Sequence, residues 1–258
     1  DPVSLMNNIL HVTDYLKEQI RAQGGDPQRE TLDFVCAKSG EPYFIDSFGE
    51  YWRAYHFVED AYALEEVKDP QDFYQSAVAF GNFQRMLADF PADTLTETIA
   101  GFHDTKARFA AFEKAVEEDV CGRAAGVQQE IRFIKDRYDV ACVLGDLLEA
   151  GELPLRVTHN DTKSNNVLMD NATGKGLCVI DLDTVMPGLA VNDFGDSIRF
   201  GASTGAEDEK DLSKISCDME LYDIYAKGFV EGCGGALTDM EIECLPIGAK
   251  VMTYECGM

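Results

Sequence analysis

The sequence predicts an α+β protein, and a small β-rich lobe joined to a larger helical lobe is one arrangement that fits. Aromatic and β-branched residues dominate residues 32–58, where short turn sequences separate the apolar runs. From about residue 57 onward, apolar residues recur at intervals of three and four, which is typical of helices. A short β-rich insert at 155–181 interrupts this helical part.

A helix is predicted over residues 2–20, because apolar residues recur there at helical spacing, and Asp1 and Pro2 suit the N-cap and first turn. The sequence GGDPQ then breaks the helical pattern. Three short antiparallel strands are predicted next: TLDFVCA (31–37), PYFIDS (42–47) and YWRAYHFV (51–58). The sequences SGE and FGE supply the turns between these strands.

The rest of the chain is predicted to be mainly helical. Helical periodicity covers five segments, near 70–90, 105–119, 127–149, 207–231 and 238–256. The β insert supplies three strands: LRVTHND (155–161), NVLMD (166–170) and LCVID (177–181). The Gly-rich sequence EGCGGA (231–236) has no strand before it and no Lys-Ser/Thr after it. We therefore predict a loop at a helix C-terminus there, and not a phosphate-binding loop.

The chain of 258 residues is strongly acidic, with a formal net charge of −25 and a pI of about 4.3. Such a surface repels nucleic-acid phosphates and anionic lipid, so we expect neither a nucleic-acid partner nor a membrane partner. The acidity could mark a cationic substrate, but the simpler interpretation is the solvated surface of a cytoplasmic protein. We find no signal peptide and no apolar run of transmembrane length.

The eight cysteines include no C-x-x-C pair, and several lie in apolar runs such as FVCA (34–37) and LCVI (177–180). This pattern predicts buried thiols in a reducing compartment, and it argues against disulfides and zinc sites. His56 and His103 have no acidic or cysteine partner at metal-ligand spacing. We therefore expect core or surface histidines at both positions.

The β insert carries the residues that point to chemistry. Asp161 follows a strand, Asn166 comes five residues later, and Asp181 ends the strand LCVID twenty residues after Asp161. Phosphoryl transfer from a nucleotide needs a carboxylate that takes the acceptor proton, and hard oxygen ligands for Mg²⁺ beside it. The catalytic loop of protein kinases, H-R-D-x-x-x-x-N followed by D-F-G, has the same order. The alternative is a solvated Asp/Asn-rich turn without chemistry.

The stretch THNDTKSNNVL, followed by CVIDLDTVMPG and NDFGDSIR, resembles the aminoglycoside phosphotransferase and choline kinase superfamily. It is most similar to the N-acetylhexosamine 1-kinase branch, which phosphorylates the anomeric hydroxyl of N-acetylglucosamine or N-acetylgalactosamine. The close match covers roughly residues 155–200. The resemblance implies a bilobal protein-kinase-like fold, with a partial nucleotide-binding lobe at 1–60 and a catalytic and acceptor-binding lobe at 61–258. It also implies ATP and Mg²⁺, and a small-molecule acceptor.

The resemblance assigns roles to individual residues. Asp161 falls on the catalytic base, Asn166 on the Mg²⁺-binding amide, and Asp181 on the metal-binding carboxylate. Asp183 is expected to assist at the metal. Lys163 stands where many protein kinases keep a lysine that faces the transferred phosphate, although an exposed turn lysine is an equal alternative.

Three further residues are expected to support the site. In this superfamily the position of His159 mostly braces the catalytic loop through hydrogen bonds. The tripeptide D-F-G that begins at Asp193 lies 32 residues beyond Asp161 and follows no apolar strand. Asp181 is therefore the better metal ligand, and Asp193 or Asp196 is expected to start a helix and support the loop. A role of either residue in acceptor binding is the less favoured option.

A kinase of this type also needs a Gly-rich turn and a strand lysine at the nucleotide phosphates. Neither precedes the helix at 2–20, so we expect either a missing N-terminal segment or a non-catalytic relative. Retention of the three site residues favours the first explanation. Glu18 is a weak candidate for the ion-pair partner of that lysine. The sequence YHFVEDA (55–61) is the expected hinge, with these backbone groups facing adenine: Phe57, Val58 and Glu59.

Three functions remain open from the sequence. The first is an ATP- and Mg²⁺-dependent kinase for N-acetylhexosamines. The second is a kinase for a cationic alcohol such as an aminoglycoside or choline, which the acidic charge favours. For choline, aromatic residues should surround the ammonium group, but the lone Trp52 lies on a predicted small-lobe strand. The third is a nucleotide-binding or interaction module without turnover.

Overall fold

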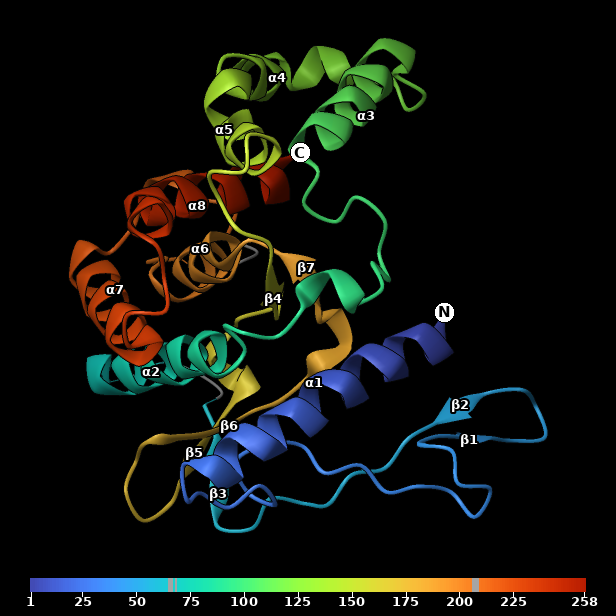
Figure 1. The fold of residues 1–258 in the computed structure, drawn as a ribbon. Coiled ribbons are helices and arrows are strands. Elements are labelled where there is room, and N and C mark those ends of the chain that lie inside the picture. Colours follow the sequence, from blue (N-terminus) through green and yellow to red (C-terminus); the bar gives the residue numbers. More distant parts are fainter. Residues whose placement is uncertain (65–66, 68, 206–208) are drawn as a thin grey trace.

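The computed structural model describes residues 1–64, 67, 69–205 and 209–258 of the chain, and these residues form a mixed α+β fold with two lobes (Figure 1). The helices are α1 (Pro2–Ala22), α2 (Pro70–Met86), α3 (Thr105–Glu118), α4 (Gln128–Lys135), α5 (Tyr138–Glu149), α6 (Ala190–Gly201), α7 (Met219–Cys233) and α8 (Asp239–Gly257). The strands are β1 (Phe44–Ile45), β2 (Tyr51–Trp52), β3 (Ala61–Ala63), β4 (Arg156–Thr158), β5 (Val167–Asp170), β6 (Gly176–Val179) and β7 (Met186–Gly188).

Helix α1 forms as the sequence predicts. The Asp1 side chain accepts a hydrogen bond from the backbone N–H of Val3, and Pro2 occupies the first turn. Its apolar residues face one side and are almost fully buried, including Ile9 and Val12. They pack with residues of β6 and of the turn after it, such as Leu182. Helix α1 therefore connects the N-terminal part of the chain to the segment that carries Asp181.

The three strands predicted between residues 31 and 58 are much shorter in the structure, and the first of them is not a strand. Only β1 and β2 form a ladder, with Phe44 opposite Trp52, and the segment before them makes a single bridge from Phe34 to Tyr55. The side chains of Phe44 and Trp52 are exposed, and Figure 1 shows this hairpin apart from the helical body. A two-stranded hairpin without a packed face is marginal, so β propensity alone does not extend the strands.

The strands of the β insert are confirmed, although they are shorter than predicted. Strands β5 and β6 pair antiparallel, and β3 joins them on the other edge of β5 to give the order β3-β5-β6. Strand β3 was not predicted and continues from the expected hinge. Strand β4 pairs antiparallel with β7 in a separate two-stranded sheet. This pairing brings the segment after β4 next to the segment between β6 and β7.

The predicted helices near 70–90, 105–119 and 238–256 are confirmed as α2, α3 and α8. The helix predicted over 127–149 is two helices, α4 and α5. The helix predicted over 207–231 begins only at Met219, because Asp218 caps it there, accepting hydrogen bonds from two backbone N–H groups of the first turn. Residues 207 and 208 of that prediction lie outside the described residues. The predicted loop after α7 is confirmed, with Gly234 in the left-handed region at φ 55°.

Helix α6 is not among the helices predicted from periodicity, although the family resemblance placed a helix start at Asp193 or Asp196. It begins at Ala190, and its polar residues Asp193 and Asp196 are buried against the loop that follows β4 instead of facing solvent. It packs closely against α8, where a Cβ atom added at Gly195 would lie 2.4 Å from the carbonyl oxygen of Gly248. Helices α2 and α7 approach one another in the same way through Gly81 and Gly232. The contact with α8 helps to hold α6 behind the segment that follows β4.

All eight cysteines are free thiols, and only four of them are buried: Cys142, Cys178, Cys233 and Cys244. Cys36 was predicted to be buried and is exposed, because no second layer of described residues covers the small-lobe hairpin. Within the described part of the chain, no helix combines the length and the apolar character that a membrane crossing requires.

Candidate active site

The segment after β4 is held in place by the buried ring of His159. Its Nδ1 accepts a hydrogen bond from the backbone N–H of Asp161 (3.2 Å), so Nε2 carries the proton and donates to the carbonyl of Ile180 (2.8 Å). The ring lies edge-on to Phe80 and Phe83. His159 therefore connects the loop that carries Asp161 to the strand that leads to Asp181.

The carboxylate of Asp161 is open to a ligand and is oriented by two neighbours. The Asn166 side chain donates from Nδ2 to the Asp161 carbonyl (2.8 Å) and to its Oδ2 (3.2 Å). The Nζ of Lys163 lies 3.3 Å from Asp161 Oδ1. The side chain of Asp161 is 31% exposed, so a hydroxyl group could reach it. The loop thus presents one fixed carboxylate with a cation beside it.

Asp181 and Asn166 are neighbours because β5 and β6 pair. Val167 lies opposite Val179 in this ladder, and the backbone N–H of Ile180 donates to the carbonyl of Asn166 (2.9 Å). Asp181 itself adopts a left-handed conformation at φ 59°, which ends the strand. Among the described residues, none donates a hydrogen bond to its carboxylate. That carboxylate is available as a ligand.

A cleft of about 220 Å³ lies beside these residues. The C-terminal part of the chain contributes Asn166, Asp181 and Asp183 to it, and the N-terminal part contributes Leu32, Phe34, Arg53 and Tyr55. The cleft is therefore acidic on one side and largely apolar and aromatic on the other. The structure brings together all three residues that the sequence assigned to metal binding.

The donor set in this cleft fits a hard divalent cation. The amide nitrogen of Asn166 is engaged by Asp161, which leaves the amide oxygen as the free ligand atom. Two carboxylates and one amide oxygen match what Mg²⁺ prefers in proteins. Across the described ranges, no group of three or more His, Cys, Asp or Glu side chains forms a metal-binding cluster.

Asp193 lies behind the loop, inside α6, and does not line the cleft. Its carboxylate is fully buried and accepts from the backbone N–H groups of His159 (2.9 Å) and Asn160 (2.8 Å), and from Gln84 Nε2 (2.8 Å). Burial raises the pKa of Asp193, and the hydrogen bonds from the loop act in the opposite direction. Asp196 similarly accepts from the backbone N–H of Thr162 (2.9 Å).

A second layer of hydrogen bonds had no signal in the sequence. The Thr162 hydroxyl donates to the Asp193 carbonyl (2.6 Å), and Ser197 donates to the Thr162 carbonyl (2.8 Å). Tyr225, on α7, donates to Ser197 (2.5 Å), and burial raises the pKa of this phenol. Gln84 is a further missed residue. Each of these partners lies more than 25 positions from the residue it contacts, beyond the range of any local motif.

The hinge residues expected to face adenine are not part of the cleft lining. Phe57 is exposed, Val58 is buried in the core of the N-terminal part, and Glu59 is exposed. The carbonyl of Glu59 already accepts a hydrogen bond from Arg29 Nη2 (3.1 Å), which also pairs with Asp170. Glu18 is exposed on α1 and lies away from the cleft lining. The structure therefore groups the residues assigned to catalysis and metal binding, and of the expected hinge (55–61) only Tyr55 is among the residues that line the cleft.

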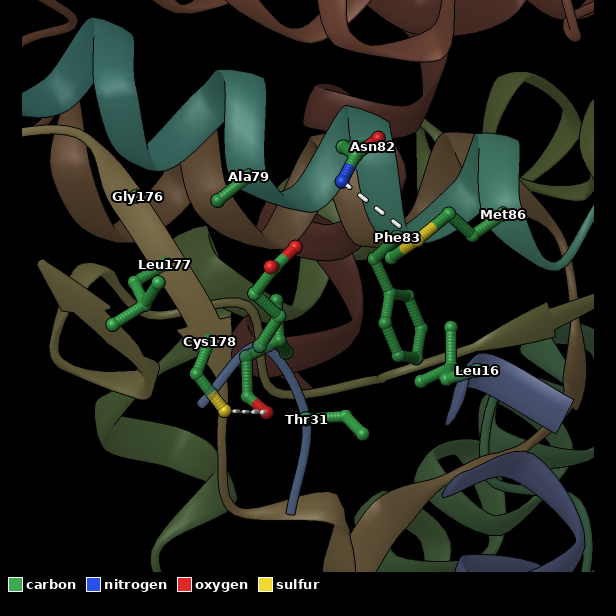
Figure 2. A pocket seen from close by; sticks show the side chains of 11 residues that line it. Leu16, Thr31, Ala79, Asn82, Phe83, Met86, Gly176, Leu177 and Cys178 are labelled. Carbon is green, nitrogen blue, oxygen red and sulfur yellow. Dashed lines mark hydrogen bonds between the residues drawn. The ribbon is translucent and has the colours of Figure 1, made fainter. Parts of the chain in front are cut away.

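A smaller cavity of about 30 Å³ lies between α1, α2 and β6, where Leu16, Asn82, Phe83 and Cys178 meet (Figure 2). This volume is on the scale of a water molecule and is too small for a nucleotide or a sugar. Burial raises the pKa of the Cys178 thiol to about 12, so the thiolate that could react is scarcely populated. Neither its volume nor this thiol indicates a second site.

The sequence profile of the phosphotransferase enzyme family matches residues 26–224. Three solved structures have similar folds at low sequence identity. Amicoumacin kinase hAmiN, in complex with AMP-PNP, Ca²⁺ and Ami, is 13% identical over 96% of this chain and 68% of its own, with a TM-score of 0.59. A microcompartment-associated aminopropanol kinase is 15% identical over 97% and 79%, with a TM-score of 0.58. AMP-bound spectinomycin phosphotransferase APH(9)-Ia is 14% identical over 94% and 72%, with a TM-score of 0.53. These similarities confirm the predicted bilobal kinase-like fold.

Proposed function

Because the chain belongs to the phosphotransferase enzyme family, we propose that it transfers the γ-phosphate of ATP to a hydroxyl group of a small molecule, with Mg²⁺ as the metal. The observation that carries this proposal is that Asn166 and Asp181 line one cleft, while the side chain of Asn166 also donates a hydrogen bond to the carboxylate of Asp161. An open carboxylate beside a set of hard oxygen ligands is what phosphoryl transfer requires of a protein. We keep 1–60 as the nucleotide-binding part and 61–258 as the catalytic part within this proposal.

Asp161 is the catalytic base in this mechanism. Its carboxylate accepts the proton of the acceptor hydroxyl as the oxygen forms a bond to the γ-phosphorus, and the bond from phosphorus to the β-phosphate oxygen breaks to release ADP. Asn166 holds the carboxylate through its Nδ2 group, which limits rotation of the side chain. Fixing the base in this way lowers the entropic cost of reaching the reactive geometry.

The other site residues act on charge. Asn166, Asp181 and Asp183 are the residues that would hold Mg²⁺, which when bound neutralises negative charge on the phosphates. Lys163 lies next to the base, where its ammonium group can interact with oxygens of the transferred phosphoryl group. His159, Asp193 and Asp196 are positioning residues, because they contact the loop and not the cleft.

For the acceptor, we propose the anomeric hydroxyl of an N-acetylhexosamine. The support is the resemblance over residues 155–200, which is narrower than the superfamily pattern. An anomeric hydroxyl is more acidic than an ordinary alcohol, so a single carboxylate suffices as its base. A second candidate is a cationic alcohol, which the net charge of −25 favours.

The test is an assay of the full-length gene product with ATP and Mg²⁺ against N-acetylglucosamine, N-acetylgalactosamine, an aminoglycoside and choline. Phosphorus NMR should detect a sugar 1-phosphate. Phosphorylation of the aminoglycoside or choline without any sugar 1-phosphate would contradict the proposed sugar acceptor, and the proposal of kinase activity would stand. Nucleotide binding without phosphate transfer to any acceptor would contradict the kinase itself.

A further inference from the structure

Arg53 contributes the only positive charge among the described residues that line the cleft. It follows β2, in the N-terminal part of the chain, and its Nη2 donates to Oδ1 of Asp183, 130 positions later. The other charged groups at the cleft are the carboxylates of Asp181 and Asp183. One guanidinium group therefore faces the residues that would hold a metal.

Arg53 has a second contact besides Asp183, and both side chains of this ion pair are partly exposed. The Nη1 of Arg53 also donates to the sulfur of Met6 on α1 (4.0 Å), so the guanidinium group has a second, weak partner there. The Asp183 side chain is 46% exposed, and the Arg53 side chain is 30% exposed. An ion pair at such exposure contributes little stability and exchanges readily for a better partner.

We propose that Arg53 is a phosphate-binding residue of the nucleotide, and that Asp183 holds it in place until the nucleotide arrives. This inference rests on the proposed function, in which the cleft binds ATP with Mg²⁺. The guanidinium group and a metal ion compete for the same carboxylate. The phosphates that accompany the metal offer Arg53 several anionic oxygens, and its planar donors match phosphate geometry.

The competition has a consequence that a purely structural role would not produce. Replacing Arg53 by Met keeps an unbranched side chain and removes the charge. A divalent cation alone should then bind more tightly, by about two- to fivefold, because it no longer displaces an exposed ion pair. Nucleotide triphosphate with metal should bind more weakly, by about tenfold or more, because charge-assisted hydrogen bonds to phosphate are lost. Adenosine, which has no phosphate, should bind unchanged.

The experiment measures these three affinities on the full-length protein. Mn²⁺ alone is titrated by electron paramagnetic resonance, and AMP-PNP with Mg²⁺ and adenosine are titrated by calorimetry. Lys135→Met is the matched control, because it also removes one positive charge from an exposed ion pair. Lys135 on α4 pairs with Glu113 on α3, and both helices are distant from the hairpin that precedes Arg53 (Figure 1). This control should change none of the three affinities. Arg53→Lys should restore part of the AMP-PNP affinity.

Opposite changes for Mn²⁺ and AMP-PNP in Arg53→Met would support the proposal. Changes in the same direction, or an AMP-PNP affinity equal to that of the wild type, would overturn it. Arg53→Gln gives the same two comparisons if circular dichroism shows that Arg53→Met is misfolded. Failure of the wild-type protein to bind AMP-PNP with Mg²⁺ would contradict the proposed function instead, which separates the two failures.

Discussion

The loop after β4 and the hairpin β1–β2 are both short segments with strong local sequence signals, yet they fold differently. The loop is fixed by buried acceptors from a distant helix, since Asp193 and Asp196 accept from three of its backbone N–H groups. The hairpin has a two-residue ladder, and its aromatic side chains are exposed. A local signal thus produces a defined structure where distant residues complete its hydrogen bonds and cover it.

The largest effect is expected at the base. Asp161→Asn should lower turnover by about 10² to 10⁴, because a positioned proton acceptor is lost, while nucleotide affinity stays nearly unchanged. Steady-state kinetics and calorimetry measure the two quantities. Asp223→Asn, the same change at an exposed carboxylate of α7, is the control and should match the wild type. Turnover within threefold of wild type in Asp161→Asn would remove the assignment.

The buried brace is expected to contribute mainly to stability. Asp193→Asn replaces an acceptor of three hydrogen bonds by an amide that cannot accept them all, so the free energy of unfolding should fall by about 2–3 kcal/mol. Urea unfolding measures this loss. The Mg²⁺ concentration for half-maximal velocity should not change, because Asp193 does not line the cleft. A higher Mg²⁺ requirement without loss of stability would place Asp193 at the metal.

At the proposed metal site we expect the opposite pattern, in which the Mg²⁺ requirement changes and the stability does not. Asp181→Ala should raise the Mg²⁺ concentration for half-maximal velocity by about tenfold or more, because losing even a residue that only supports a metal ligand costs about 10- to 100-fold in affinity. Its free energy of unfolding should stay close to that of the wild type, since the Asp181 carboxylate accepts no hydrogen bond from the described residues. Magnesium titrations of initial rate, with Asp223→Ala as control, test this. An unchanged requirement would exclude Asp181 as a ligand.

The smallest effect is expected in the hairpin. Trp52→Ser should change the free energy of unfolding by less than about 0.5 kcal/mol, because the indole is 61% exposed and its hydrogen bond to Asp46 lies at the surface. The same urea measurement used for Asp193→Asn applies. A loss comparable to that of Asp193→Asn would mean that the hairpin is covered in solution.

The site was largely predictable because its residues lie on one hairpin and the loop before it. Asp161, Asn166 and Asp181 are close in sequence, and the pairing of β5 with β6 brings them together. The brace was expected only through the family resemblance. Gln84 and Tyr225 could not be predicted, because each reaches the site across a helix–helix contact that no local pattern encodes.

The helix predictions from periodicity are confirmed for several segments. The remaining elements depend on contacts that the local sequence pattern does not show. The polar face of α6 is buried against the loop after β4, so α6 lacks the solvent-facing side of an ordinary surface helix. Helix α7 begins where Asp218 caps it. The strands between residues 31 and 58 were predicted from propensity, which measures how well a side chain fits a packed sheet surface. No described residues provide that surface, and the ladder is correspondingly short.

The close contact between α6 and α8 limits which residues can replace the glycines at their interface. A Cβ atom added at Gly248 would lie 2.1 Å from the carbonyl oxygen of Val191, and one added at Gly195 would meet Gly248. Any larger residue at either position must push the two helices apart, and α6 carries the carboxylates that hold the loop after β4. A genetic screen for loss of activity should therefore recover substitutions at both glycines, although neither lines the cleft. In alignments of active homologues, these two columns should tolerate alanine rarely and larger residues almost never.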